Sequence, residues 1–269
     1  MDKGAQARQG NQVVIQQEGS DLTSPKGKQE MTGAYQKAYF NNQSLNNLLS
    51  TVATRTGARA INGMKNPNTT IKKVVEKRVD DPSQPYGLND VGDISRGRLV
   101  FQNQQALKKG LDTLKSEAKD AGIKVVKEQN MFTNPDKEAK ETGYKGYHVD
   151  LEMPNGQHTE VQLHTINSYA SAMLTHAIHE SYGDNVPKNA ASESRTAADH
   201  VMRMDPFQAQ QLADQLDHAA APAVAEAQRK AIQVAMGQRN VQHAEPLRST
   251  SALNPMGQSL SVEGSNYGL

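Results

Sequence analysis

Two carboxylates and three cationic side chains of this sequence have the types and surroundings that a phosphate-transfer reaction requires. Asp93 lies at the entrance to an apolar run that predicts a short buried strand, and Glu160 lies on a later predicted strand. Lys65, Lys73 and Arg98 can supply positive charge to the same site. Fixed cations hold a polyphosphate, one carboxylate can hold Mg²⁺, and a second can accept the proton of an attacking hydroxyl. The sequence therefore contains the parts of a kinase-like site.

The common phosphate-binding loops do not occur in this sequence. It has neither the GxxxxGK[ST] pattern nor the glycine loop of protein kinases. Cysteine is absent, which excludes disulfides, thiolate nucleophiles and zinc–thiolate sites. Lys and Arg number 30 against 29 Asp and Glu, so the formal charge is +1 and no global field attracts nucleic acid or an anionic membrane. Any phosphate site must be local.

Period-two alternation predicts a β-hairpin at residues 147–164. Two alternating runs are separated by an Asn-Gly turn, which is a strong short-range hairpin signal. On the return strand, Glu160, Gln162 and His164 share one face, and the apolar residues between them share the other. We expect the polar face to line a cleft.

The remaining pattern predicts an α+β fold. It is a mixed, mainly antiparallel sheet of about five strands, flanked by helices and followed by C-terminal helices. Apolar spacing predicts helices at about 33–60, from 67, at 104–121, at 168–182 and within 192–236, and further strands at 97–101 and 123–126. Composition divides the chain into a flexible leader at 1–30, a catalytic domain at 31–190, a helical C-terminal segment at 191–237 and a flexible tail at 238–269.

Five short motifs follow one another between about residues 60 and 180. They are Lys65-x3-Thr69-x3-Lys73, Asp-Ile-Ser-Arg-Gly-Arg-Leu-Val at 93–100, Gly-Tyr-Lys-Gly-Tyr-His at 143–148, Glu-Val-Gln-Leu-His-Thr at 160–165, and Ala172 with His176. Their order and gaps resemble those of RelA/SpoT-type alarmone synthetases, which are pyrophosphokinases. The ordered set carries the resemblance, because each motif alone is short.

The resemblance implies a stand-alone enzyme, either a small synthetase or a toxin-like member of the family. Such an enzyme uses Mg²⁺ to move the β,γ-pyrophosphate of ATP to the 3′-hydroxyl of a purine nucleotide. Asp93 and Glu160 would be the catalytic residues and the Mg²⁺ ligands, with Glu160 activating the hydroxyl. The ATP-binding residues would be Lys65, Thr69, Lys73 and Arg98, and the acceptor-binding residues Lys140, Tyr144, His148 and Gln162. Tyr144 would stack on the acceptor base.

Several positions depart from the family pattern. Gly63 stands where the family has an arginine that stacks on adenine, and Arg55, Arg59 or Arg78 could replace it from elsewhere. The other departures are His164 for Arg, Thr142 for Asn and Thr175 for Glu. They fall on positions near the bases, so the acceptor is open between GDP or GTP and ADP or ATP.

Two alternative functions remain at this point. One is a toxin that pyrophosphorylates the 3′-end of tRNA, and the other is a nucleotide-binding module of the same fold without activity. A toxin-like member would be paired with an immunity or antitoxin protein, and the oligomeric state is open. The sequence has neither a signal-peptide-like apolar region nor a stretch long enough to span a membrane. We therefore expect a cytoplasmic site of action, with any export independent of a cleaved signal peptide.

Overall fold

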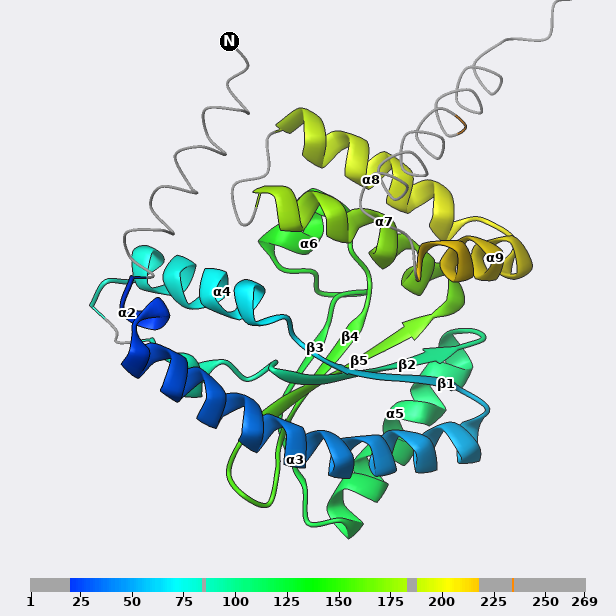
Figure 1. Cartoon of the computed structure of the whole chain (residues 1–269). Coiled ribbons are helices and arrows are strands. Elements are labelled where there is room, and N and C mark those ends of the chain that lie inside the picture. The colour runs from blue at the N-terminus through cyan, green and yellow to red at the C-terminus, as the bar shows by residue number, and fades with distance from the viewer. Residues whose placement is uncertain (1–19, 84–85, 183–187, 218–233, 235–269) are drawn as a thin grey trace, which may run out of the picture.

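A five-stranded sheet lies at the centre of the part of the chain that the computed structural model describes, residues 20–83, 86–182, 188–217 and 234 (Figure 1). The strands are β1 (Arg59–Met64), β2 (Ser95–Phe101), β3 (Lys124–Asn130), β4 (Tyr147–Glu152) and β5 (His158–Thr165). The helices are α2 (Ser20–Thr23), α3 (Pro25–Thr56), α4 (Pro67–Asp80), α5 (Gln104–Asp120), α6 (Lys137–Thr142), α7 (Ile166–Tyr182), α8 (Lys188–Met202) and α9 (Pro206–Leu216), with a short 3₁₀ turn η1 (Leu88–Asp90).

The strand order confirms the predicted mixed, mainly antiparallel sheet. It is β1-β2-β5-β4-β3, in which β2 and β5 run parallel and the other neighbouring pairs run antiparallel. The predicted hairpin is β4–β5, and Gly156 in its turn has φ of 79°, a left-handed conformation that glycine adopts without strain. The hairpin lies between β2 and β3, so α5 connects two strands that are not neighbours in the sheet.

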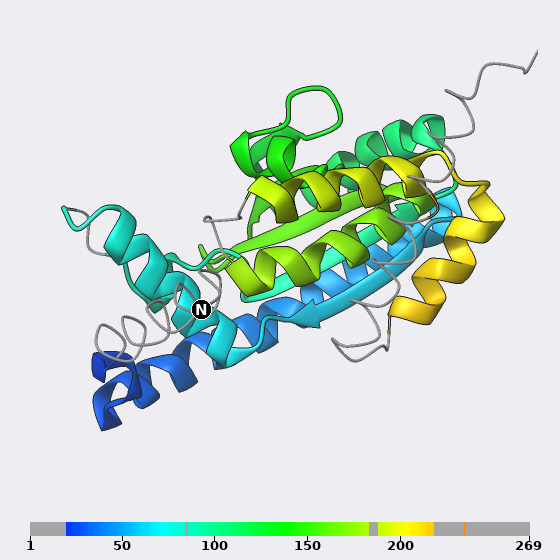
Figure 2. The same ribbon diagram turned by 90° about the horizontal axis from the view of Figure 1, so that it is seen from above.

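Helices cover both faces of the sheet (Figures 1 and 2). Leu99 and Phe101 of β2 point to the face covered by α3 and α5, and they belong to the largest buried cluster. Val100 points to the other face and packs with residues of α7, α8 and α9. Successive residues of a strand alternate between the two faces, so this single strand contributes to both cores.

Local signals set the ends of the helices that flank the first strand. The N-cap of α3 is Ser24, whose side chain accepts a hydrogen bond from the Gly27 amide, and Gly57 ends this helix with φ of 70°. The N-cap of α4 is Asn66, followed by Pro67 at the first helical position. The chain segment between these caps is therefore free to form β1.

Two boundaries differ from the predictions, and one helix was missed. The expected leader included residues 20–30, which instead form α2 and the start of α3, because Leu22 is 3% exposed and packs in a buried cluster with α4. Residues 59–60 belong to β1 rather than to a helix; this edge strand has no fully buried residue and so shows no clear alternation. The helix α6 was not predicted.

The C-terminal predictions are tested only in part. Helices α8 and α9 occupy residues 188–202 and 206–216, where a helical segment was expected from 191. Residues 1–19 of the expected leader, most of 218–237 and the expected tail lie outside the described residues.

Candidate active site

A cavity of about 900 Å³ opens on the face of the sheet that carries α7. Its lining comes from α4 and the loop before it, from the sheet, and from α6 and α7. All but one of the predicted site residues line it, namely Asp93, Glu160, Lys65, Thr69, Lys73, Arg98, Tyr144, His148 and Gln162. Ala172 and His176 of the last motif line it as well. The five motifs thus meet at one place, and the hairpin lies beside Asp93.

The register of the sheet explains why these side chains converge. Gly63, Arg96, Glu160, Asp150 and Lys127 are successive neighbours across the five strands. Directly paired residues present their side chains on the same face. The adjacent row on this face is Ile61, Arg98, Gln162, His148 and Gln129. The strands therefore contribute polar side chains to the cavity, namely Arg96, Arg98, Lys127, His148, Glu160 and Gln162, whereas the opposite face of the sheet is apolar core.

Asp93 binds two lysines at the cavity wall. Lys65 Nζ donates to Asp93 Oδ2 at 2.7 Å, and Lys73 Nζ donates to Oδ1 at 2.9 Å. Burial alone would raise the pKa of Asp93, but the two ammonium groups hold it below its usual value. Burial lowers the pKa of Lys65, which Asp93 partly offsets. The site therefore concentrates positive charge around an ionised carboxylate.

The loop before α4 is fixed from behind by Tyr35 of α3. The Tyr35 hydroxyl donates to the backbone carbonyl of Lys65 at 2.7 Å and lies 2.7 Å from the Thr70 hydroxyl. The Lys65 amide donates to the carbonyl of Ile94 at 2.8 Å. These bonds tie the lysine loop to the segment that carries Asp93, so the ion pair is held by the backbone on both sides.

Glu160 lies on β5 with hydrogen-bond partners at both carboxylate oxygens. Gln162 Nε2 donates to Oε1 at 2.6 Å, and His148 Nδ1 lies 3.2 Å from Oε2. Arg98 Nε in turn donates to Gln162 Oε1 at 3.1 Å, which fixes the orientation of the amide. Burial raises the pKa of Glu160, but its His148 and Gln162 partners outweigh burial, so the pKa lies below the usual value. The carboxylate is therefore ionised and oriented.

Tyr144 and two histidines extend this network into the core. The Tyr144 hydroxyl lies 2.7 Å from His148 Nε2 and 3.4 Å from His164 Nε2, and His164 Nδ1 lies 3.2 Å from the Ser168 hydroxyl. Burial raises the pKa of Tyr144, so the phenol is neutral. Its ring is packed edge-on against both imidazoles.

The expectation that His164 lines the cleft is wrong. Its relative exposure is 0%, although it shares a face with Glu160 and Gln162 as the alternation predicts. Tyr144 lies between this imidazole and the cavity, and Ser168 of α7 takes its other nitrogen. His164 therefore supports Tyr144 from behind and does not contact a bound nucleotide directly.

Lys140 is the predicted site residue that the structure places elsewhere. It is exposed on α6 and is absent from the described lining of the cavity. The same helix turns Ala139 and Thr142 inward, with relative exposures of 4% and 2%, because residues three apart share a helix face. The prediction that Lys140 binds the acceptor is therefore not supported by its position.

The three arginines suggested as replacements at Gly63 are also elsewhere. Each forms an ion pair with a carboxylate outside the described lining of the cavity: Arg55 with Glu117, Arg59 with Asp214 and Asp217, and Arg78 with Asp21. Sequence reasoning missed Arg96, which lines the cavity opposite Gly63. A signal was present, because Arg96 stands two residues before Arg98 and so shares its face of the strand.

The donor set of this cavity fits a Mg²⁺ ion. Magnesium is commonly bound by one or two carboxylates together with waters and substrate phosphates. Asp93 and Glu160 line the same cavity, and the charge of Asp93 acts on Glu160. Within the described ranges, no three or more His, Cys, Asp or Glu side chains are grouped as a metal site. The carboxylate pair therefore suits a metal that completes its coordination from the substrate.

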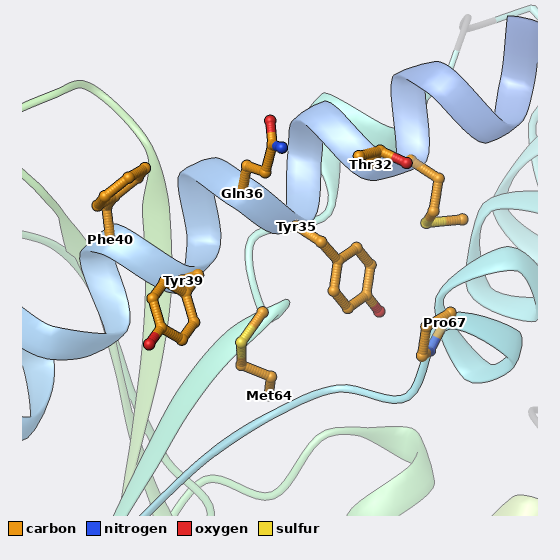
Figure 3. Close-up of a pocket in the computed structure, with 8 residues that line it drawn as sticks. Thr32, Tyr35, Gln36, Tyr39, Phe40, Met64 and Pro67 are labelled. Atoms are coloured by element: carbon orange, nitrogen blue, oxygen red, sulfur yellow. The ribbon is translucent and has the colours of Figure 1, made fainter.

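A second, more apolar cavity of about 580 Å³ lies along α3 (Figure 3). Tyr35, Tyr39 and Phe40 line it from the helix, and Met64 and Pro67 line it from the other side. It shares Tyr35 with the lysine loop but contains no pair of charged groups among its described lining.

No helix within the described residues is long and apolar enough to cross a membrane.

Comparisons with known proteins agree with this arrangement. The model of the family described as "Region found in RelA / SpoT proteins" matches residues 62–185. The crystal structure of small alarmone synthetase 1 from Bacillus subtilis bound to its product pppGpp superposes with a TM-score of 0.50 at 14% identity, covering 71% of this chain and 98% of that one. A second structure of that synthetase gives 0.50 at 15% identity, covering 73% and 100%.

The two superpositions, each with a TM-score of 0.50, show a shared fold. A search among curated proteins found no match. The family match spans every motif from the lysine loop to α7. The similarity to the RelA/SpoT region thus lies within residues 62–185 of this chain.

Proposed function

We propose that the protein is an ATP-dependent pyrophosphokinase, which transfers the β,γ-pyrophosphate of ATP to the 3′-hydroxyl of a purine nucleotide. The observation that carries the proposal is the placement of Asp93 and Glu160 in one cavity, together with Lys65, Lys73 and Arg98. The RelA/SpoT region supports a pyrophosphotransferase in general. The structural relative with pppGpp as its product supports a purine nucleotide as acceptor.

The cations of the cavity would bind the triphosphate of the donor. Phosphoryl oxygens carry the charge that grows during transfer, and prearranged donors stabilise it in a site that excludes water. Lys65 and Lys73 reach the same carboxylate from the loop and from α4. A Mg²⁺ ion held by Asp93 and Glu160 would neutralise phosphate charge when bound. Thr69 lies between the lysines on the cavity wall.

Glu160 would accept the proton of the acceptor. The acceptor 3′-oxygen attacks the β-phosphorus, the bond from that phosphorus to the α,β-bridging oxygen breaks, and AMP leaves. The 3′-hydroxyl proton passes to the Glu160 carboxylate, which its neighbours keep ionised. His148 and Gln162 position this carboxylate through their hydrogen bonds.

Tyr144 would provide the stacking surface for the acceptor base. An aromatic ring can stack on any base, so discrimination between guanine and adenine requires polar groups near Tyr144. Since His164 is buried behind the ring, it cannot read the base directly. We therefore keep the hypothesis that ADP or ATP is accepted alongside, or instead of, GDP or GTP, since a site without guanine-specific hydrogen bonds rejects adenine weakly.

The structure does not favour the alternative functions. Recognition of tRNA would need a basic surface continuous with the site, but the lysine-rich helix α5 packs on the opposite face of the sheet from the cavity. Asp93 and Glu160 both line the cavity, which favours catalysis over a nucleotide-binding module without activity. A toxin-like role, an immunity partner and a cytoplasmic site of action stay predictions from the resemblance.

The test is transfer of label from γ-³²P-ATP with Mg²⁺ to GDP, GTP, ADP, ATP or bulk tRNA, resolved by chromatography. Asp93→Asn and Glu160→Gln keep the shape and remove the charge, so each should lower the rate by roughly 10²-fold or more. Asp120→Asn, an exposed carboxylate at the end of α5, is the matched control. Circular dichroism confirms folding. Unchanged turnover in either folded variant would refute the proposed roles.

A further inference from the structure

A third row of side chains continues the cavity face of the sheet beyond the two rows that contribute to the cavity. It consists of Arg59, Val100 and His164, which are successive neighbours on β1, β2 and β5. Tyr169 of α7 covers this row: its ring centroid lies 6.0 Å from that of His164 and 5.9 Å from the guanidinium carbon of Arg59. Tyr169 also lines the cavity, so its ring forms the wall at this end.

Asp217, the C-cap residue of α9, holds Tyr169 in this place. The Tyr169 hydroxyl donates to Asp217 Oδ1 at 2.5 Å, and Arg59 donates to the other carboxylate oxygen, Oδ2. Burial and the Asp217 carboxylate raise the pKa of Tyr169 to about 12, so the phenol is neutral and remains the donor. We call Asp217, Arg59 and Tyr169 the α9 clasp. It closes where α9 packs on α7 (Figures 1 and 2).

The position of Asp217 is unfavourable for α9 taken alone. The C-terminal end of a helix carries partial negative charge, so a carboxylate there destabilises the helix. The partners that offset this cost, Arg59 and Tyr169, lie on β1 and α7. Arg59 and Asp217 both lie outside residues 62–185, the part that matches the RelA/SpoT family model. The clasp thus joins that part of the chain to elements outside it.

Tyr169 and Tyr144 pack against the same imidazole. The Tyr144 ring centroid lies 5.8 Å from that of His164 with an interplanar angle of 88°, and the Tyr169 ring is tilted by 60° against it. His164 is also bound through Nδ1 to the Ser168 hydroxyl at 3.2 Å. Close-packed interiors transmit displacements, so a shift of Tyr169 would move His164 and, with it, the ring of Tyr144.

We propose that Asp217 and Tyr169 are positioning residues for acceptor binding, so that α9 is part of the acceptor side of the site. They act through His164, which fixes the ring of Tyr144. The inference rests on the proposed stacking of the acceptor base on Tyr144. The donor side has its own supports, because the lysine loop is held from α3 and from the segment before β2. Loss of the clasp should therefore affect the acceptor and spare the donor.

Calorimetric titration of GDP and of ADP into protein saturated with Mg²⁺ and the α,β-methylene analogue of ATP measures acceptor binding without transfer. Asp217→Ala should raise the dissociation constant of the acceptor about 3- to 10-fold, in the lower part of the range for residues coupled in one network, because the ring of Tyr144 remains. Binding of the analogue, measured separately, should stay within about twofold, as expected for independent sites.

The matched control is Asp214→Ala. Asp214 also pairs with Arg59, at 3.0 Å, but its other hydrogen bond is to Gln210 of α9. Its removal should leave the binding of acceptor and analogue unchanged.

Tyr169→Phe tests the same hydrogen bond from its other end. It removes the hydroxyl and keeps the ring, so it should weaken acceptor binding to a similar extent. Combining it with Asp217→Ala should add little, because both substitutions break one hydrogen bond. Circular dichroism confirms folding, and Tyr169→Phe alone decides the question if Asp217→Ala does not fold.

The outcomes distinguish this inference from the proposed function. If the wild type binds neither GDP nor ADP, the proposed acceptor fails and the inference fails with it. If the wild type binds an acceptor and the folded clasp variants bind it equally well, only the role of the clasp is refuted. Equal weakening by Asp217→Ala and Asp214→Ala would assign the effect to Arg59 and refute the role of Tyr169. Weaker binding of the analogue and the acceptor alike would show a general loss of structure and refute the inference.

Discussion

Burial of His164 should make the stability of this protein depend on pH in a predictable direction. The imidazole has a relative exposure of 0%, and burial lowers its pKa from 6.5 to about 3, with further lowering by Arg98 and His148. The folded protein therefore holds His164 neutral, whereas the unfolded chain binds a proton there below pH 6.5. Stability from this residue is complete above pH 6.5 and decreases as the pH falls toward 3.

The size of the effect follows from the two pKa values. Each pH unit between them contributes about 1.4 kcal/mol, so between pH 7 and pH 5 this residue should lower the free energy of unfolding by about 2 kcal/mol. Asparagine in place of His164 does not titrate. It can keep a hydrogen bond to Ser168, although the contact with Tyr144 is lost.

The assay is urea unfolding followed by circular dichroism at pH 7 and pH 5, for the wild type and His164→Asn. The readout is the difference in free energy between the two pH values within each protein, which removes the constant cost of the substitution. The wild type should lose about 2 kcal/mol more than the variant. His158→Asn, which removes an exposed histidine of β5, should behave like the wild type. Equal losses in the wild type and His164→Asn would show that the buried imidazole is not held neutral.

Substitutions at two further residues test the supports of the site. Tyr144→Ala should weaken acceptor binding by about 1–3 kcal/mol, the range for one base–aromatic stack, and leave binding of the α,β-methylene analogue of ATP nearly unchanged. Tyr144→Phe keeps the ring and should therefore keep acceptor binding. Calorimetry with each nucleotide checks both variants, and equal acceptor affinities for Tyr144→Ala and the wild type would exclude stacking. Tyr35→Phe removes the hydroxyl that binds the Lys65 carbonyl and Thr70, so the free energy of unfolding, measured in urea, should fall by about 1 kcal/mol. An unchanged unfolding midpoint would mean that these hydrogen bonds do not stabilise the loop.

The sequence determined the parts of this protein that depend on local pattern. Alternation and an Asn-Gly turn predicted the hairpin β4–β5, and caps and spacing predicted the start of α4 and the bounds of α5 closely. The carboxylates Asp93 and Glu160 could be selected because their motifs belong to an ordered set of five along the chain. These signals work because backbone periodicity and turn chemistry act over a few residues.

Tertiary structure decided which of those side chains meet and which are covered. Gly63 and Arg96 are neighbours through strand pairing across 33 positions, a relation that no local pattern carries. His164 has the expected face but is buried because Tyr144 and Ser168 close over it, and Lys140 is turned outward by the rotation of α6. Period two fixes the face of a strand on which a residue lies, but the segments packed on that face decide whether it reaches the cavity.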